Sequence, residues 1–404
     1  MALTVSGFEQ YQLGAQFALT AEQVTIASNA EKYFMSELHP LQQRMDDEDW
    51  WPAENFRRVA AMGYLGTTVT DQWGGQGLDY LTSGLICEAM AYANPSFAFG
   101  WLNADNLVSD NMCRNASPEQ KAKYLPRLCK GEIVGALGMT EPGAGSDALG
   151  SMSTHARLEG DHYILNGTKI YITNGPIADI VLVYARTNPN LGRSKGISAF
   201  IVEKGWPGFR VAQKLDKMGF RGSPLGELVF EDCKVPVSNL VGVENGGHII
   251  MHSGLDLERV LSAMLCIGPA RRALDLALEY SKLRVQFGKS ISTFQMIQSK
   301  LAEMYVELEA ARTLVYRVLD ACNTSAHGTL GKGSIHRMAA AALFQAARAG
   351  KFIMDEAVQI HGGLGYMRDS EVNRLYRTTK VMEIAAGSQE IRKLIIAGDL
   401  LKDR

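Results

Sequence analysis

Residues 162–175 read HYILNGTKIYITNG, and this stretch decides the fold class. Apolar and polar residues alternate on both sides of Asn166-Gly167, a dipeptide typical of two-residue turns, so the pattern predicts a β-hairpin. The alternation continues through IVLVYAR (180–186), ISAFIVEK (197–204) and GELVFEDCKVP (226–236). The sequence therefore predicts a β domain over residues 133–244.

Helical patterns lie on both sides of this β region. Segments 21–38, 52–61, 81–92 and 118–129 are typical of helices by apolar spacing or by proline and glycine boundaries. After residue 245, apolar residues recur at three- and four-residue steps through 302–322, and 334–360 is rich in alanine. We predict an α+β protein with an N-terminal helical domain (1–132), a middle β-barrel or sandwich domain (133–244) and a C-terminal helical bundle (245–404).

Composition narrows the class of protein. The 404 residues carry 41 Lys plus Arg against 43 Asp plus Glu, and this balance argues against a nucleic-acid binder. No apolar run approaches the ~18–20 residues of a membrane span, and the N-terminus lacks a basic signal-peptide region. Six scattered cysteines form no C-x-x-C pair, so we expect neither a metal site nor disulfides, and a reduced cytoplasmic location. An enzyme is the leading interpretation.

Two segments of the β region suggest a ligand. Residues 137–147 read LGMTEPGAGSD and join Thr140 to a proline-fixed turn with two glycines. Backbone N–H groups of such a turn can face a planar ring or an anion. Tyr171 and Thr173, at i and i+2, would share one strand face and could wall a ring on its other side. Taken alone, the first segment is more typical of an ordinary turn between domains, and the second of a half-buried strand end.

Four further segments lie in the C-terminal region. SGLDLER (253–259) contains Glu258, either a helix-start charge or a partly buried general base. RVQFGK (284–289), followed by Phe294-Gln295, suits a pyrophosphate and an adenine, or a surface loop. QIHGGLGY (359–366) permits close backbone approach, or simply ends a helix. EIAAGSQEIR (383–392) places small residues before a helix that Ser388 could cap.

The order and separation of these segments resemble the acyl-CoA dehydrogenase family over nearly the whole chain. SGLDLER and FEDCKVP (230–236) are most similar to the isovaleryl-CoA dehydrogenase type. The resemblance implies a C-terminal four-helix bundle and a homotetramer, built as a dimer of dimers, with one FAD per subunit. It also implies an acyl-CoA substrate and reoxidation by an electron-transfer flavoprotein.

The resemblance also implies roles for individual residues. Those expected to bind FAD are Leu137, Met139, Thr140, Ser146, Tyr171, Ile172, Thr173, Arg284, Phe287, Gln295, Gln359, Gly362, Gly363, Ser388 and Glu390, with the ADP half held partly by a neighbouring subunit. Those expected to contact the acyl-CoA are Ser146, Ile249, Asp256, Arg259, Ala385, Ala386 and Gly387.

The expected catalytic base is Glu258. Most family members carry the base in a Tyr-Glu-Gly-Thr run near the C-terminus, but here Ala385-Ala386 precede Gly387. The isovaleryl type takes its base from the helix after the β domain, and Glu258 matches that position. Burial should raise the pKa of this carboxyl. The expected donors to the thioester oxygen are the Ala386 N–H and a ribityl hydroxyl of FAD.

The resulting prediction is α,β-dehydrogenation of a short- or medium-chain acyl-CoA to the trans-2-enoyl-CoA. The two alanines leave room near the reacting carbons, which favours a branched or cyclic acyl group, whereas Ile249 replaces an aromatic residue of the isovaleryl type and leaves chain length open. The main alternative is dehydrogenation of an acyl or aminoacyl thioester, such as prolyl, on a carrier protein. An oxidase, a DNA-binding relative and an inactive partner of a heteromeric dehydrogenase are less well supported.

Overall fold

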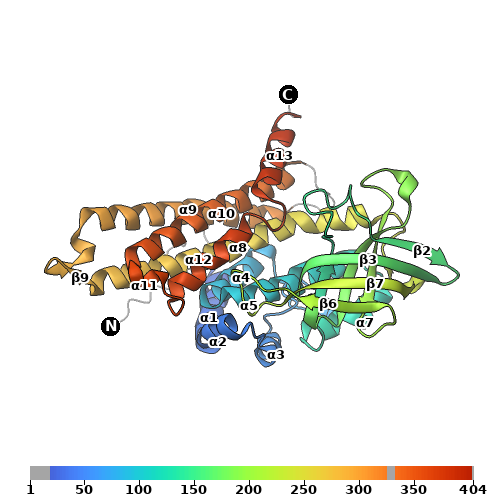
Figure 1. Ribbon diagram of the computed structural model, residues 1–404, viewed down its shortest axis with the longest axis horizontal. Coiled ribbons are helices and arrows are strands. Elements are labelled where there is room, and N and C mark those ends of the chain that lie inside the picture. Colours follow the sequence, from blue (N-terminus) through green and yellow to red (C-terminus); the bar gives the residue numbers. More distant parts are fainter. Residues whose placement is uncertain (1–18, 325–332, 403–404) are drawn as a thin grey trace.

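The computed structural model describes residues 19–324 and 333–402. Helices form the N- and C-terminal parts of the chain, and one sheet lies between them in sequence (Figure 1). The sheet occupies one end of the molecule, and the C-terminal helices extend toward the other end (Figure 1). The predicted α+β class is therefore confirmed.

The N-terminal helices begin and end close to the predicted positions. Thr20 and Ser117 each form a capping box, so their hydroxyls and the glutamines three residues later satisfy the first free N–H groups. The helices are α1 (Ala21–Glu37), α2 (Gln42–Glu48), α3 (Ala53–Ala61), α4 (Tyr80–Ala93), α5 (Pro95–Leu102), α6 (Asn111–Asn115) and α7 (Pro118–Cys129), with a π-helical segment η4 (Asn103–Asp110) between α5 and α6.

The middle sheet follows the order β6-β7-β3-β2-β4-β5-β8, and β1 pairs in parallel with β4. Its strands are β1 (Gly135–Gly138), β2 (His155–Glu159), β3 (His162–Thr173), β4 (Ile180–Arg186), β5 (Ile197–Glu203), β6 (Phe209–Lys214), β7 (Leu225–Pro236) and β8 (Leu240–Val241). Strands β4 and β5 are buried almost throughout, as expected for central strands.

The predicted hairpin turn at Asn166-Gly167 is wrong. β3 runs unbroken through both residues, and the true turn lies at 160–161, where Glu159 faces His162. The register against β7 shifts between Leu165 and Gly167, where Asn166 lies opposite two residues of β7, Glu231 and Asp232, so the extra residue of this β-bulge belongs to β7. A type I′ turn needs positive φ at both central residues, and here only Gly167 has it (φ 147°).

The C-terminal region begins with α8 (Gly247–Leu283), a single long helix. A short hairpin of β9 (Val285–Gln286) and β10 (Lys289–Ser290) follows it, at the end of the molecule opposite the sheet (Figure 1). The other elements are α9 (Gln295–Thr324), α10 (Gly333–His361), α11 (Gly363–Tyr366), α12 (Glu371–Met382) and α13 (Gln389–Leu400). Helices α8, α9, α10 and α12 pack together as the expected four-helix bundle.

One apolar core joins the two helical parts, because residues of α1 and α4 pack with those of α8, α9 and α10. The limits 132/133 and 244/245 remain a prediction. They fall near the start of β1 at Gly135 and of α8 at Gly247. None of the described helices combines the length and apolar character needed to cross a bilayer.

Candidate active site

Glu258 lies well inside α8, three turns beyond its first residue, Gly247. The helix-start interpretation is therefore wrong, since macrodipole effects fade within the first turn. The side chain is half-buried, and within the described residues its carboxylate makes no hydrogen bond or ion pair. Burial raises its pKa to about 7, although Arg259 and Arg392 act in the opposite direction. A carboxyl with such a pKa can accept a proton at neutral pH.

The segment 137–147 and the end of β3 lie side by side. The Thr140 carbonyl accepts a hydrogen bond from the Ile170 N–H (2.9 Å), and Lys169 Nζ donates to the Met139 carbonyl (3.1 Å). Leu137 and Met139 are half-buried, and they pack on the same apolar cluster as Leu255 of α8. The structure thus brings the predicted ring-facing segment close to the helix that carries the predicted base.

A buried ion pair holds the segment 137–147 against β3. Lys169 Nζ lies 2.8 Å from Glu141 Oε1, and both side chains are almost fully buried. Burial alone would raise the pKa of Glu141, but Lys169 and the hydrogen bonds from Ser153 and Thr154 lower it to about 2. Burial lowers the pKa of Lys169 to about 8, against the opposing effect of Glu141. Both groups are charged at neutral pH, so the pair holds the backbone around Met139.

Tyr171 and Thr173, which were expected to share one strand face, differ in exposure. Tyr171 is 62% exposed, whereas Thr173 is 8% exposed and Ile172 faces the sheet core. The register shifts between Lys169 and Ile172, and Tyr171 takes a left-handed backbone (φ 60°). This second irregularity turns the Tyr171 ring outward, as bulges near functional sites commonly do.

Ala385, Ala386 and Gly387 form the turn between α12 and α13, and all three are half-buried. Arg259 Nε donates to the Ala386 carbonyl (3.3 Å), which places this turn beside the segment of α8 that carries Glu258.

The other predicted acyl-CoA residues differ in exposure. Asp256 and Arg259 are buried and paired with each other (2.9 Å), which leaves little of either side chain for a ligand. Ser146 and Ile249 are exposed.

The predicted ADP-binding residues gather at the far end of α8. Phe287 is 92% exposed at the tip of the β9–β10 hairpin, and its ring lies 6.1 Å from that of Phe294. The Tyr280 ring, one turn before Arg284, stacks on His361 at 4.4 Å, so residues 359–363 lie near the hairpin. The members of this group are Arg284, Phe287, Gln295, Gln359, Gly362 and Gly363, and all of them are exposed.

Ser388 caps α13 by accepting from the Ile391 N–H, as the sequence allowed, and Glu390 lies exposed in the first turn of that helix.

These surroundings fit a flavin. An added Cβ at Gly143 or Gly145 would meet nothing within 4 Å, so the backbone there is open to a ligand. Tyr171 offers an exposed aromatic face, and Leu137 and Met139 offer half-buried apolar side chains. A flat, mostly apolar ring system with polar edges suits this combination.

Three contributors were missed from the sequence. Lys169 stands in a strand of otherwise apolar inward residues, and that buried-lysine pattern was a usable signal. Arg392 belongs to the quoted run 383–392 but received no role. Tyr184 is fully buried in β4, and its pKa is raised strongly by burial and in part by Glu258. No local signal could have paired it with a residue 74 positions away.

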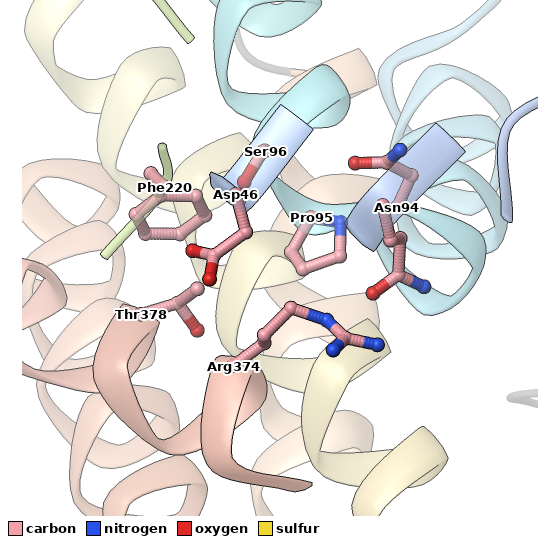
Figure 2. Close-up of a pocket in the computed structure, with 8 residues that line it drawn as sticks. Asp46, Asn94, Pro95, Ser96, Phe220, Arg374 and Thr378 are labelled. Carbon is pink, nitrogen blue, oxygen red and sulfur yellow. The ribbon is translucent and has the colours of Figure 1, made fainter. Parts of the chain in front are cut away.

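A small cavity lies apart from these groups, between α2, α5, α12 and the loop around Phe220 (Figure 2). Its charged lining is already used by the fold, because Asp46 forms a two-pronged ion pair with Arg377. Arg374 donates to the Asp369 carbonyl. We assign this cavity to the seam between domains rather than to the chemistry.

Comparison with known proteins identifies the family. Models of the acyl-CoA dehydrogenase N-terminal, middle and C-terminal domains match residues 20–132, 136–233 and 244–401. A mitochondrial isovaleryl-CoA dehydrogenase of Pongo abelii is 41% identical over 94% of this chain and 88% of its own length. The structure of butyryl-CoA dehydrogenase from Megasphaera elsdenii is 36% identical, with a TM-score of 0.90 over 96% of this chain and all of that one.

A structure described as PigA with FAD and proline is 30% identical, with a TM-score of 0.91 over 96% of this chain and all of that one. Family-wide matches at this level establish membership and, with it, the redox cofactor. This chain belongs to the acyl-CoA dehydrogenase family and is an FAD-dependent oxidoreductase.

Proposed function

We propose that the protein dehydrogenates a short- or medium-chain, branched or cyclic acyl-CoA to the trans-2-enoyl-CoA. The observation that carries this proposal is Glu258, a carboxyl with a pKa raised to about 7 beside the segment that suits a flavin. The likeness to isovaleryl- and butyryl-CoA dehydrogenases supports the substrate class. Electron transfer to an electron-transfer flavoprotein and a cytoplasmic location belong to the same proposal.

The chemistry assigned to the chain is proton abstraction and positioning. Glu258 takes the α-proton of the thioester, and the electron pair of that C–H bond becomes the new C=C bond as hydride leaves the β-carbon. When bound, FAD supplies the acceptor for this hydride. The Ala386 N–H donates to the thioester oxygen, where negative charge develops; one well-placed donor is worth about 3–4 kcal/mol.

The flavin half of FAD is assigned to the neighbourhood of Glu258. Leu137, Met139 and Thr140 would lie on one side, and the Tyr171–Thr173 strand end on the other. Within residues 171–173, a contact with the flavin is best supported for Tyr171. Its exposed ring has no apolar partner in the core clusters of the described residues. Ser146 would contact either the phosphates or the thioester arm.

The ADP half is assigned to the distal group around Arg284 and Phe287. Glu258 and Leu283 lie on the same helix and are separated by roughly 38 Å at 1.5 Å per residue. One chain therefore presents its proposed flavin-binding residues and its proposed ADP-binding residues far apart along α8. One FAD would contact both sets if a second subunit placed its ADP-binding residues beside the flavin-binding residues of the first. This requirement for a second subunit supports the proposed homotetramer.

The room around Ala385 and Ala386 supports a branched or cyclic acyl group, because two methyl groups replace the larger side chains of most relatives. Asp256 and Arg259 as CoA contacts, and Ile249 as a chain-length determinant, remain predictions.

A carrier-protein thioester, such as prolyl, is the second candidate. The structural similarity to PigA, described with FAD and proline, favours it specifically. Both candidate reactions use the same base and the same flavin-binding residues. They differ in whether the thioester arm belongs to CoA or to a carrier protein.

An anaerobic titration tests both candidates. The purified yellow protein receives isovaleryl-, butyryl- or octanoyl-CoA, or a prolyl thioester on a carrier protein, and the loss of flavin absorbance is recorded. We expect one acyl-CoA to bleach the wild type and the Glu383→Gln control, but not Glu258→Gln. Glu383 is a suitable control because it is a nearby carboxylate already paired with Lys380.

The alternatives give different results. Bleaching only by the carrier thioester would favour the second candidate, and bleaching of Glu258→Gln would overturn the assignment of the base. A protein that no thioester reduces would contradict both candidates.

A further inference from the structure

The turn between α12 and α13 has a backbone that costs free energy to maintain. Ala386 has φ 54° and Gly387 has φ 89°. A non-glycine residue is disfavoured in the left-handed region, because its Cβ comes too close to the carbonyl oxygen that follows. The Ala385 N–H bonds to the Val381 carbonyl (2.8 Å), but the Ala386 N–H makes no hydrogen bond within the described residues. The fold thus holds a strained turn in which the Ala386 N–H, like that of Gly387, has no partner within the described residues.

Two arginines from different helices hold this turn. Arg259 of α8 donates through Nε to the Ala386 carbonyl (3.3 Å), and Arg392 of α13 donates through Nη2 to the Ala385 carbonyl (2.5 Å). Arg392 also donates through Nη1 to the Met382 carbonyl (2.9 Å) and to Gln389 Oε1 (3.0 Å). Consecutive carbonyls of the turn are therefore fixed by separate guanidinium groups.

Each arginine is itself fixed. Arg259 Nη1 lies 2.9 Å from Asp256 Oδ1, and the same oxygen lies 2.7 Å from His336 Nδ1 of α10. These contacts anchor the guanidinium of Arg259 while its Nε remains directed at Ala386. Arg259 therefore bridges Asp256 and the turn through two different nitrogens of its guanidinium group.

Arg392 is the more unusual of the two. Its side chain is 0% exposed, and within the described residues it forms no ion pair with a carboxylate. Its Nε has no hydrogen-bond partner. Burial lowers its pKa to about 10, while the charge of Glu258 is among the groups that raise it. Burying a cation against carbonyls alone costs several kcal/mol, so an apolar side chain would give a more stable fold at this site.

We propose that Arg259 and Arg392 are positioning residues that hold the Ala385–Gly387 turn so that the Ala386 N–H is directed at the thioester oxygen. This inference rests on the proposed function. It gives Arg259 a role inside the protein in place of the predicted contact with the CoA arm. Hydrogen bonds from these two arginines explain why the turn keeps its strained geometry without a tyrosine or glutamate side chain packed against it.

The first test measures the hydrogen bond itself. Crotonyl-CoA, labelled with ¹³C at its thioester carbonyl, is an enoyl ligand that cannot donate the α-proton and β-hydride. Its carbonyl stretch is recorded by infrared difference spectroscopy on the FAD-loaded protein. We expect binding to lower the stretching frequency in the wild type, and Arg392→Met and Arg259→Lys to lose most of that shift.

The second test separates positioning from stability. Misalignment of one donor should lower kcat roughly 10- to 100-fold, with KM nearly unchanged, because the loss occurs mainly in the transition state. Arg312→Lys is the matched control, since Arg312 is equally buried but pairs with Glu88 away from the turn. It should lower stability and keep both the infrared shift and kcat.

Each outcome decides a separate point. Wild-type bleaching together with an unchanged infrared shift in both arginine variants would overturn this inference and leave the proposed function intact. A wild type that neither bleaches nor binds crotonyl-CoA would contradict the proposed function instead. If Arg392→Met does not fold, Arg392→Lys keeps the charge but loses the paired geometry, and the same loss of infrared shift is expected.

Discussion

Replacing Glu258 by glutamine should stabilise the protein at alkaline pH while abolishing its activity. The carboxyl has a pKa of about 7 in the folded chain, against 4.5 when unperturbed. Between these values the unfolded chain has released the proton and the folded chain retains it. The stability of the wild type therefore falls as pH rises through this interval and levels off above pH 7.

The magnitude follows from the same interval. Each pH unit between the two pKa values corresponds to about 1.4 kcal/mol, so the full cost of ionising Glu258 in the fold is about 3 kcal/mol. The side chain keeps some solvent access, which reduces the expected effect to about 1–2 kcal/mol. Glutamine cannot ionise, so Glu258→Gln gains this amount at pH 8 and little at pH 5.

Thermal unfolding with saturating FAD provides the measurement, because a bound cofactor shifts Tm unless its occupancy is held constant. We expect a Tm roughly 1–2 °C above wild type at pH 8, because the unfolding entropy of a chain of this length is about 0.85 kcal/mol/K, and a difference near zero at pH 5. Glu279→Gln serves as the control, since Glu279 is an exposed glutamate on the same helix. A Glu258→Gln protein no more stable than wild type at pH 8, or equally stabilised at both pH values, would refute the reasoning.

Three further outcomes are expected. Single-turnover bleaching by the preferred acyl-CoA should rise about tenfold from pH 6 to a plateau above pH 8, because only the ionised Glu258 accepts the proton; a flat profile would contradict this. Lys169→Met should leave Glu141 buried and unpaired, and should therefore lower the unfolding free energy by about 3–5 kcal/mol in denaturant titrations. A loss below about 1 kcal/mol would contradict the structural role of this ion pair. Gly167→Ala should lower Tm, because its Cβ would lie 2.4 Å from Thr154 Oγ1 at φ 147°; an unchanged Tm would show that β3 relaxes around the added methyl group.

Local signals predicted the helices well. The boundaries of α1 and α7 follow from capping residues, proline positions and apolar spacing, all of which lie within a few residues of the element they define. The Asn166-Gly167 signal failed because β3 continues through the dipeptide, with the bulge opposite it in β7, and that outcome depends on pairing with β7. That partner strand lies about 60 residues farther along the chain.

The site was predictable as a set of segments but not as an arrangement. The resemblance singled out Glu258 and the 137–147 run, and the structure brings their surroundings together. The contacts of Arg259 and Arg392 with the Ala385–Ala386 turn depend on how α8 packs against α12 and α13. Burial, which raises the pKa of Glu258, is likewise a property of the packed protein.

The irregularity that turns the Tyr171 ring outward affects which insertions and deletions the chain tolerates. Lys169 and Ile172 are both buried although they are three positions apart, because β3 holds one residue more here than the facing stretch of β7. Removing one residue between them would restore the regular period of two and keep the rest of β3 in register. The exposed residues 189–195 have no such alternation, and gaining or losing a residue there changes mainly the entropy of closing the loop. Length changes should therefore be accepted in that loop, whereas the loss of one residue at Tyr171 should leave the rest of β3 paired but remove the outward ring.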